Sequence, residues 1–226
     1  MALDRKLVEK LVREALRGQL AAEGRIIKPV RHNGGPNPLV VNVSARHMHV
    51  RAEDLAILFG PGAELTKLKD LYQEGEFASE QVVNLIGPRQ RLLPNVRILG
   101  PIRKYSQVEL SYTDGVFLGM ELPLRLSGDH HDTPGIVVVG PHGALNLRQG
   151  VIRAMRHVHM HPDDLAHYAV KDGDGMQLRV HGPCGVCFEN LRVREHPKVR
   201  LEVHIDTDEG NACDLESATH VELIRS

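Results

Sequence analysis

The sequence predicts a mainly β fold of two related units, each a β-barrel or sandwich capped by short α-helices, preceded by an N-terminal amphipathic helix. Many short segments rich in β-branched residues and punctuated by Gly, Pro or Asp indicate strands. Helical patterns are few, as in barrels and sandwiches with small helical caps. One segment recurs in both halves of the chain, which indicates an internal duplication. A chain of 226 residues with 42% hydrophobic content is long enough for one large domain or two small ones.

The amphipathic helix is predicted in residues 1–24. Apolar residues recur there at i, i+3, i+4 and i+7 spacing across residues 7–16, with charged residues opposite. Asp4 is a suitable N-cap, and Gly24 follows the end of the pattern. Residues 25–37 contain Pro and Gly breaks and are predicted to form a linker. A helix behind such a linker packs on its own domain or a dimer partner, or docks on another protein, and both interpretations stay open.

The remaining chain is predicted to be mostly strands. Seven segments fit the strand pattern: 38–45, 95–102, 106–113, 135–141, 176–182, 186–194 and 199–206. Short helices are predicted at 52–60 and 161–170, and a third, on a weaker pattern, at 123–129.

The recurring segment gives the organisation of the chain. "ARHMHVRAEDLAILFG" begins at Ala45 and "MRHVHMHPDDLAHYAV" begins at Met155. Both contain Arg-His-x-His followed, after the same gap, by Asp-Leu-Ala, at an offset of 110 residues from His47 to His157. We therefore predict two related units, each with a strand that ends in His-x-His and leads into a helix.

These two histidine pairs are candidate metal ligands. Side chains alternate along a strand, so His47 and His49 share one face at about 6–7 Å, as do His157 and His159. Imidazole is a natural ligand for Zn²⁺, Fe, Ni and Cu. One surface His-x-His pair is usually solvated and inert, but two pairs in a duplicated segment predict a metal site.

Other histidines and acids are further candidates for this site. His161 matches Arg51 in the repeat, and a cation does not bind metal, so we place His161 at a helix start instead. His204 is followed by several acidic residues, which makes a role as a ligand or as a hydrogen-bond partner of a ligand credible. Arg103 and Glu109 differ by an even number of positions, so they share a strand face if the strand begins early enough. A carboxylate and an arginine beside a metal suit an anionic substrate, and a solvated strand face is the competing interpretation.

Composition excludes several classes of protein. Aromatic residues make up 4% of the chain, Trp is absent and the net charge is −1, so we predict no nucleic-acid partner. No apolar run is long enough to span a membrane, and no signal peptide is recognisable, so we predict no membrane association. Three cysteines are too few for a disulfide scaffold and are predicted to be reduced in an intracellular protein.

Several long motifs between Pro38 and Glu222 resemble the PduL-type phosphotransacylases, or phosphate propanoyltransferases. They are "NVSARHMHV", "GPIRKYSQVELSYTDG", "GIVVVGPHGALNLRQGVIRAMRHVHMHPDDLA" and "LEVHIDTDEGNA". The resemblance implies two β-barrels with helical caps. It also implies that residues 38–46 and 156–226 form the first barrel and residues 47–155 the second.

The resemblance implies a site with two zinc ions. The implied ligands are His47, His49 and Glu109 for one ion, and His157, His159 and His204 for the other. Arg103 is implied to bind phosphate, and Ser127 to help position it. The coenzyme A contacts implied are Ser44, Phe117, Pro141 and Ala154.

The implied reaction exchanges coenzyme A for phosphate: acyl-CoA + phosphate ⇌ acyl phosphate + CoA, with propanoyl as the preferred acyl group, and it recycles CoA. The N-terminal helix is then an encapsulation peptide that docks a homo-oligomeric enzyme on shell or core proteins in the lumen of a bacterial microcompartment. The sequence also allows two alternative functions. One is a metal-dependent hydrolase of a small ester, thioester or phosphorylated substrate. The other is a cupin-like metal or sugar sensor without turnover.

Overall fold

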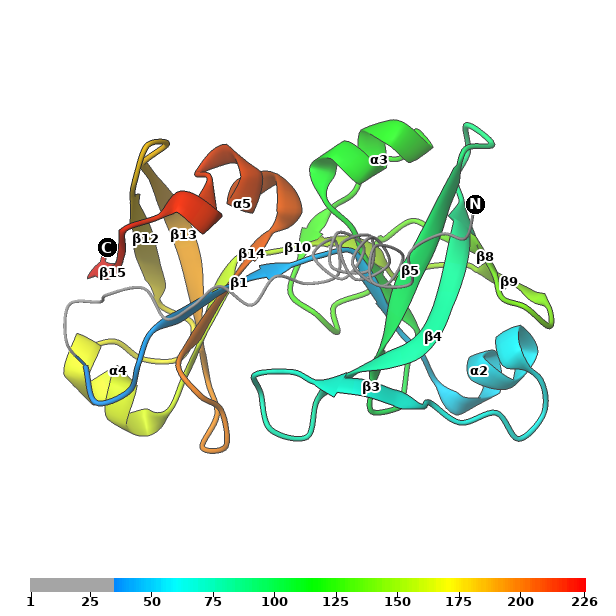
Figure 1. Cartoon of the computed structure of the whole chain (residues 1–226), viewed down its shortest axis with the longest axis horizontal. Helices are drawn as coiled ribbons and strands as arrows, with labels where there is room; N and C mark the ends of the chain where they lie inside the picture. The colour runs from blue at the N-terminus through cyan, green and yellow to red at the C-terminus, as the bar shows by residue number, and fades with distance from the viewer. Residues whose placement is uncertain (1–34) are drawn as a thin grey trace, which may run out of the picture.

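The structure, a computed structural model, describes residues 35–226 as two β-sheets with a few short helices (Figure 1). The fold is therefore mainly β, as the strand patterns predict. The predicted helix in residues 1–24 and nearly all of the linker in residues 25–37 lie outside the described residues. Among residues 35–226, no helix is both long enough and apolar enough to cross a membrane.

One sheet has six strands and contains mainly the C-terminal part of the chain, on the left of Figure 1. In spatial order they are β1 (Val40–Ser44), β14 (Glu202–Asp206), β11 (His157–Met160), β13 (Val186–Glu195), β12 (Gly175–His181) and β15 (His220–Arg225). Its core is aliphatic, with Val158, Met160, Leu178 and Leu191 fully buried. Burial of these apolar side chains is the main force that holds the sheet against its helices.

The other sheet has nine strands and lies on the right of Figure 1. Eight follow in the order β7 (Leu124–Arg125), β10 (Val151–Ala154), β6 (Gln107–Glu109), β2 (His47–His49), β5 (Leu92–Gly100), β4 (Phe77–Ile86), β8 (Ile136–Val139) and β9 (Ala144–Leu147). The ninth, β3 (Lys67–Asp70), pairs with β4. A second, separate apolar core includes Met48, Leu55, Leu85 and Ile98.

The short helices lie at strand ends. They are α2 (Ala52–Phe59), α3 (Tyr112–Leu118), α4 (Pro162–Tyr168) and α5 (Thr207–Ala212), with a 3₁₀ turn, η1 (Leu215–Ser217). The helices predicted at 52–60 and 161–170 are confirmed as α2 and α4. The helix predicted at 123–129 is wrong: this segment forms the two-residue strand β7 and a turn, in which Gly128 has a φ of 99°.

Two strands cross between the sheets. β1 leads directly into β2 along the chain, yet it pairs in parallel with β14 of the other sheet. In the same way β10 leads into β11, yet it pairs in parallel with β6. Figure 1 shows β1 and β10 in the middle of the molecule. Each sheet therefore contains one strand, β1 or β10, that comes directly before a strand of the other sheet in the sequence.

The surroundings of the crossing strands correspond in detail. The strand opposite β2 is β6, which continues into α3, and the strand opposite β11 is β14, which continues into α5. Arg46, just before β2, forms an ion pair of 3.2 Å with Asp114 in the first turn of α3. Arg156, just before β11, forms one of 2.7 Å with Glu209 in the first turn of α5. Both carboxylates close a capping box and lie where the helix dipole favours negative charge.

Hydrogen bonds also join the two halves. The side chain of Gln73, between β3 and β4, donates to the Arg200 carbonyl oxygen at 3.1 Å and to Glu202 Oε2 at 2.7 Å. The amide of Thr113 in α3 donates to Asp208 Oδ2 in α5 at 2.8 Å. These contacts help to fix the halves in one arrangement.

Candidate metal centre

The first candidate cluster contains His47 and His49 from β2 and Glu109 from β6. All three side chains are buried, and one ligand atom from each lies within 4.8 Å of the others. His47 and Glu109 are directly opposite in the antiparallel pair β2–β6, and His47 Nε2 lies 3.6 Å from Glu109 Oε2. Two imidazoles and one carboxylate form a donor set that zinc accepts readily.

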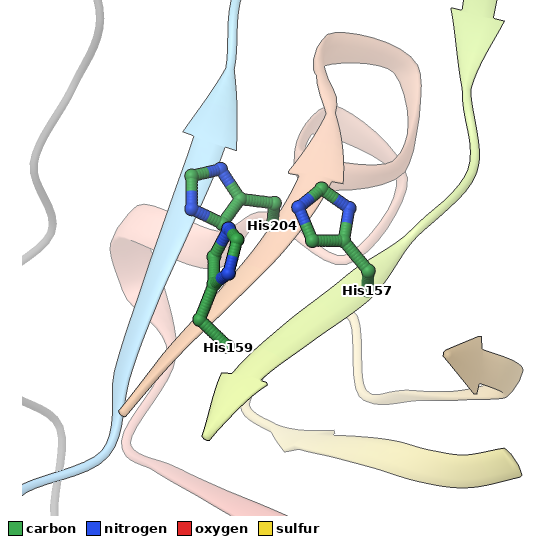
Figure 2. Close-up of side chains that lie close together, drawn as sticks. All are labelled: His157, His159 and His204. Atoms are coloured by element: carbon green, nitrogen blue, oxygen red, sulfur yellow. The ribbon is translucent and has the colours of Figure 1, made fainter. Parts of the chain in front are cut away.

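The second candidate cluster contains His157 and His159 from β11 and His204 from β14 (Figure 2). His157 and His204 are opposite in the strand pair, and their rings stack at an interplanar angle of 1° with centroids 4.9 Å apart. The His159 ring is nearly perpendicular to both, with centroids 4.9 and 5.1 Å away. Figure 2 shows the three rings gathered on one face of the two strands.

A backbone carbonyl orients the first histidine of each pair. His47 Nδ1 lies 2.8 Å from the Ala45 carbonyl oxygen, and His157 Nδ1 lies 2.8 Å from the Met155 carbonyl oxygen. A carbonyl only accepts, so each Nδ1 carries a proton, and the lone pair of the neutral ring is then on Nε2. Such a hydrogen bond is typical of metal-binding histidines because it fixes both tautomer and ring orientation.

Burial keeps several of the imidazoles neutral. Burial first, and then His47 and Arg103, lower the pKa of His49 well below its usual value. Burial, His204 and other neighbours lower the pKa of His157 likewise, and that of His159 to about 3. Neutral imidazole is the form that binds a metal. These side chains therefore do not have to release a proton to bind a metal ion near pH 7.

Two observations bear on whether metal ions fit these clusters: an unpartnered nitrogen of His49 and the proximity of the two clusters. His49 Nδ1 is buried and makes no hydrogen bond within residues 35–226. A buried polar atom without a partner is costly, and a metal ion would satisfy it. The second observation is that the two clusters are near each other, since His157 of the second cluster is close enough to influence the pKa of Glu109 in the first. Burial alone would raise the pKa of Glu109, but His47 first, and then the hydrogen bond from Ser127, hold it below its usual value.

Gln107, which the sequence did not single out for a role of its own, organises the first cluster. It is fully buried and lies opposite His49. Its Nε2 donates to Glu109 Oε1 at 2.6 Å and to Ser127 Oγ at 3.0 Å. Its Oε1 accepts from the Gly128 amide at 2.7 Å and lies 2.9 Å from His130 Nε2. Gln107 therefore holds the carboxylate of Glu109 in place and connects it to Ser127.

Glu202 lies in the corresponding place in the second cluster, opposite His159. It is 1% exposed, accepts hydrogen bonds from Asn42 Nδ2 at 3.0 Å and Gln73 Nε2 at 2.7 Å, and lies 3.0 Å from His204 Nε2. Burial raises the pKa of Glu202, but His204 and the two amides outweigh it, and the net shift is downward. Sequence reasoning missed Glu202, although it is two residues before His204 and therefore shares its strand face.

Arg103 lies beside the first cluster. It contributes to the lowered pKa values of His49 and Glu109, and its guanidinium donates to Glu76 Oε1 at 2.8 Å. Ser127 reaches the same place through Gln107. The structure thus brings Arg103 and Ser127 to the first cluster.

The four residues implied for coenzyme A are less closely grouped. Ser44 and Ala154 end the crossing strands β1 and β10, which places both near the clusters. Phe117 is on α3, is 39% exposed, and has the Arg91 guanidinium 5.2 Å from its ring centroid. Pro141, in the β8–β9 turn, lines a pocket of about 440 Å³ with Phe59, Asn84 and other residues, none of which is Ser44, Phe117 or Ala154.

His161 is confirmed at a helix start. It is the N-cap of α4, and its Nδ1 accepts a hydrogen bond from the Asp163 amide at 3.3 Å. Its matching residue, Arg51, is the N-cap of α2. The third histidine of "HVHMH" therefore caps a helix and lies outside both clusters.

Comparison with known proteins identifies the family of this chain. The family model for phosphate propanoyltransferase matches residues 40–216. A phosphate propanoyltransferase of Planctopirus limnophila is 56% identical over 225 residues, covering 99% of this chain and 92% of the relative. One of Thermotoga maritima is 46% identical over 187 residues, covering 82% and 89%. One of Rhodopseudomonas palustris is 38% identical over 227 residues, covering 100% of both chains.

These matches define an enzyme of the acyltransferase class. The chain belongs to the phosphate propanoyltransferase family, because the family model covers more than half of it and the relatives match nearly their whole length.

Proposed function

We propose that this enzyme is a phosphotransacylase that exchanges coenzyme A for phosphate on a short acyl group, propanoyl by preference, and so recycles CoA. In the forward direction a phosphate oxygen bonds to the acyl carbon, the C–S bond breaks, and CoA leaves as a thiolate that is then protonated. The observation that supports this most is the proximity of two three-residue clusters, with Arg103 beside one of them. The family match favours transfer over hydrolysis and over a sensor without turnover.

Both clusters suit zinc in the chemistry of their donors. One ion would be held by His47, His49 and Glu109. The other would be held by His157, His159 and His204. Zinc bound there would neutralise phosphate charge, orient the attacking oxygen and polarise the thioester carbonyl.

Arg103 is the proposed phosphate ligand. A guanidinium binds phosphate through two parallel hydrogen bonds, and this one lies close enough to affect Glu109 and His49. Its present partner Glu76 has to share or release it when phosphate binds. Ser127, held by Gln107, would help to position the phosphate.

The further organisation of the enzyme is proposed on the same basis. The matched crossings of β1 and β10, with their matched arginine ion pairs, support an internal duplication and two barrel domains, residues 38–46 with 156–226 and residues 47–155. Ser44 and Ala154 would line the coenzyme A channel near the clusters, and Phe117 and Pro141 its outer part. We propose that residues 1–24 dock the homo-oligomer on shell or core proteins inside a bacterial microcompartment.

A product assay tests the proposed reaction. We expect acyl phosphate and free CoA from propanoyl-CoA only when phosphate is added, whereas a hydrolase releases free acid without phosphate. Arg103→Ala should raise the KM for phosphate about 10- to 100-fold, because it removes a charge-assisted hydrogen bond of about 1.5–3 kcal/mol, and should change the KM for propanoyl-CoA much less. Free acid in the absence of phosphate, or an unchanged phosphate KM in the variant, would contradict the proposal.

A further inference from the structure

A third group of potential metal ligands lies outside both clusters, at the other end of the six-stranded sheet. It contains His181 from β12 and His220 and Glu222 from β15, and one ligand atom from each lies within 4.8 Å of the others. β15 is the last strand of the sheet, and β13 separates β12 from the strand that contains His157 and His159. The proposed reaction uses none of these three residues.

The strand pairing places the three side chains together. His181 and His220 are directly opposite in the antiparallel pair β12–β15. Glu222 is two residues after His220, so the alternation of a strand puts it on the same face. Their neighbours Val180, Val221 and Leu223 point the other way, into the core, so the group lies on the outer face of the sheet.

The distances suit a small metal ion. Glu222 Oε1 lies 3.1 Å from His220 Nε2, and Glu222 Oε2 lies 3.4 Å from His181 Nε2. Zinc bonds of 2.0–2.1 Å in a tetrahedral site put neighbouring ligand atoms about 3.3 Å apart. A small rotation of the carboxylate would therefore let one ion contact all three side chains.

The group is accessible and has an incompletely satisfied nitrogen. The side chains of His181, His220 and Glu222 are 44%, 30% and 28% exposed, so an ion can arrive from solvent. The Nε2 atom of His181 is itself shielded, and its contact with Glu222 Oε2 at 3.4 Å falls short of hydrogen-bond geometry. His220 first, and then His181, lower the pKa of Glu222, so its carboxylate is ionised near pH 7. Against these features stands Arg179, whose guanidinium lies 4.0 Å from Glu222 Oε2 and repels a cation.

We propose that His181, His220 and Glu222 bind one divalent first-row transition ion such as Zn²⁺, and that this ion fastens the edge strand β15 to β12. Two histidines and one carboxylate are an established ligand set for such ions, and three ligands leave an outward position for water. Since all the ligands come from two adjacent strands, binding requires that both strands stay paired. Arg179 makes this site weaker than either buried cluster. The competing interpretation is a carboxylate shared by two imidazoles without an ion, and it predicts no specific zinc binding.

Zinc titration of the full chain tests the proposal. Wild-type protein and the variant His181→Ala/His220→Ala are titrated with ZnCl₂, and the bound ions per chain are counted after gel filtration. We expect the variant to bind one ion fewer than wild type and to keep its phosphotransacylase activity. The isosteric variant Glu222→Gln should give the same loss without disturbing the packing. His142→Ala, an exposed histidine outside all three groups, is the matched control and should bind as many ions as wild type.

Arg179→Gln distinguishes a metal site from a merely structural cluster. Removing the repelling charge should tighten the weakest zinc site about two- to fivefold, whereas a lost structural contact would tighten nothing. Amide exchange is the second readout: zinc should protect residues 220–225 in wild type but not in Glu222→Gln.

Equal zinc counts in wild type, His181→Ala/His220→Ala and Glu222→Gln would overturn the site. Zinc binding without added protection of residues 220–225 would overturn its role at β15. These outcomes are independent of the proposed function, whose failure would appear in the product assay as free acid formed without phosphate.

Discussion

The two buried clusters share a scaffold but place their carboxylate differently. In the first, the residue opposite the leading histidine is Glu109, and the residue two positions before it is the neutral Gln107. In the second, the opposite residue is His204, and the carboxylate is the residue two positions before it, Glu202. Each cluster thus has one carboxylate on the same strand face. Glu109 is a candidate ligand of the first cluster, whereas Glu202 lies behind the candidate ligand His204 of the second.

This difference would give zinc ions bound at the two clusters different properties on one framework. A set of two histidines and a carboxylate has one negative charge, whereas a set of three histidines has none. An ion in the second cluster would therefore keep more of its positive charge and act as the stronger Lewis acid. An arginine lies near each cluster: Arg103 near the first, where it helps to lower the pKa of Glu109, and Arg194 near the second, where it helps to lower the pKa values of His157 and His159.

The largest expected effect comes from removing one ligand of each cluster. Glu109→Ala and His204→Ala should each lose one tightly bound zinc ion and at least about 100-fold in kcat/KM, more than is usual for a residue behind a ligand. Metal content measured beside activity checks this. Each variant should retain the ion of the unaltered cluster if the clusters bind independently. His161→Ala, which alters a helix cap only, should bind as much zinc as wild type. Full activity in completely metal-free protein would exclude a metal mechanism.

A smaller effect is expected from changing Glu202, the carboxylate behind His204 in the second cluster. Glu202→Gln keeps the shape of the side chain but removes the charge next to His204, and should weaken zinc at the second cluster about 10-fold. Competition with a chelator gives the two zinc affinities separately. Gln107→Glu is the reciprocal change and should affect only the first cluster. Equal weakening of both clusters by Glu202→Gln would show that the two halves do not act as separate sites.

The smallest effect is a pH dependence of the metal-free protein. His159 takes up a proton near pH 6.5 when unfolded but only near pH 3 when folded, so the unfolded state binds more protons between these values. The free energy of unfolding should therefore fall as the pH falls below 6.5, by about 1 kcal/mol from His159 at pH 5.5. Denaturant unfolding at pH 7.5 and 5.5 measures this. His159→Gln should reduce the loss, while the exposed variant His142→Ala should not. An undiminished loss in His159→Gln would assign the effect to other groups.

Much of the site could be predicted because its residues are chemically rare and their spacing is that of a strand. The repeated Arg-His-x-His required a strand and a turn into a helix, and the structure has both twice. Glu202 and Gln107 could not be assigned roles in this way. Their roles depend on partners such as Gln73, 129 residues from Glu202, which no local pattern reveals.

The fold was predictable where apolar alternation was regular and not elsewhere. Each of the seven predicted segments contains a strand, but 106–113 is a strand only as far as Glu109. There the capping box of Ser111 and Asp114 starts α3 among residues with strand-like composition. β4 was not predicted because polar residues interrupt its alternation of apolar and polar side chains, and its pairing with β5 has two register shifts. η1 and β7 are too short for any periodic pattern.

The crossing of β1 has a consequence for synthesis on the ribosome. All nine strands of the larger sheet lie between residues 47 and 154, so that sheet can form as soon as β10 has emerged. β1 is made before any of them, yet its partner β14 comes much later: Glu202 is 160 positions after Asn42. The early strand must therefore stay unpaired while a complete sheet folds beside it, and the smaller sheet closes only when the chain is nearly finished. Such a late, long-range closure slows folding and leaves a strand edge open to misassembly in the meantime.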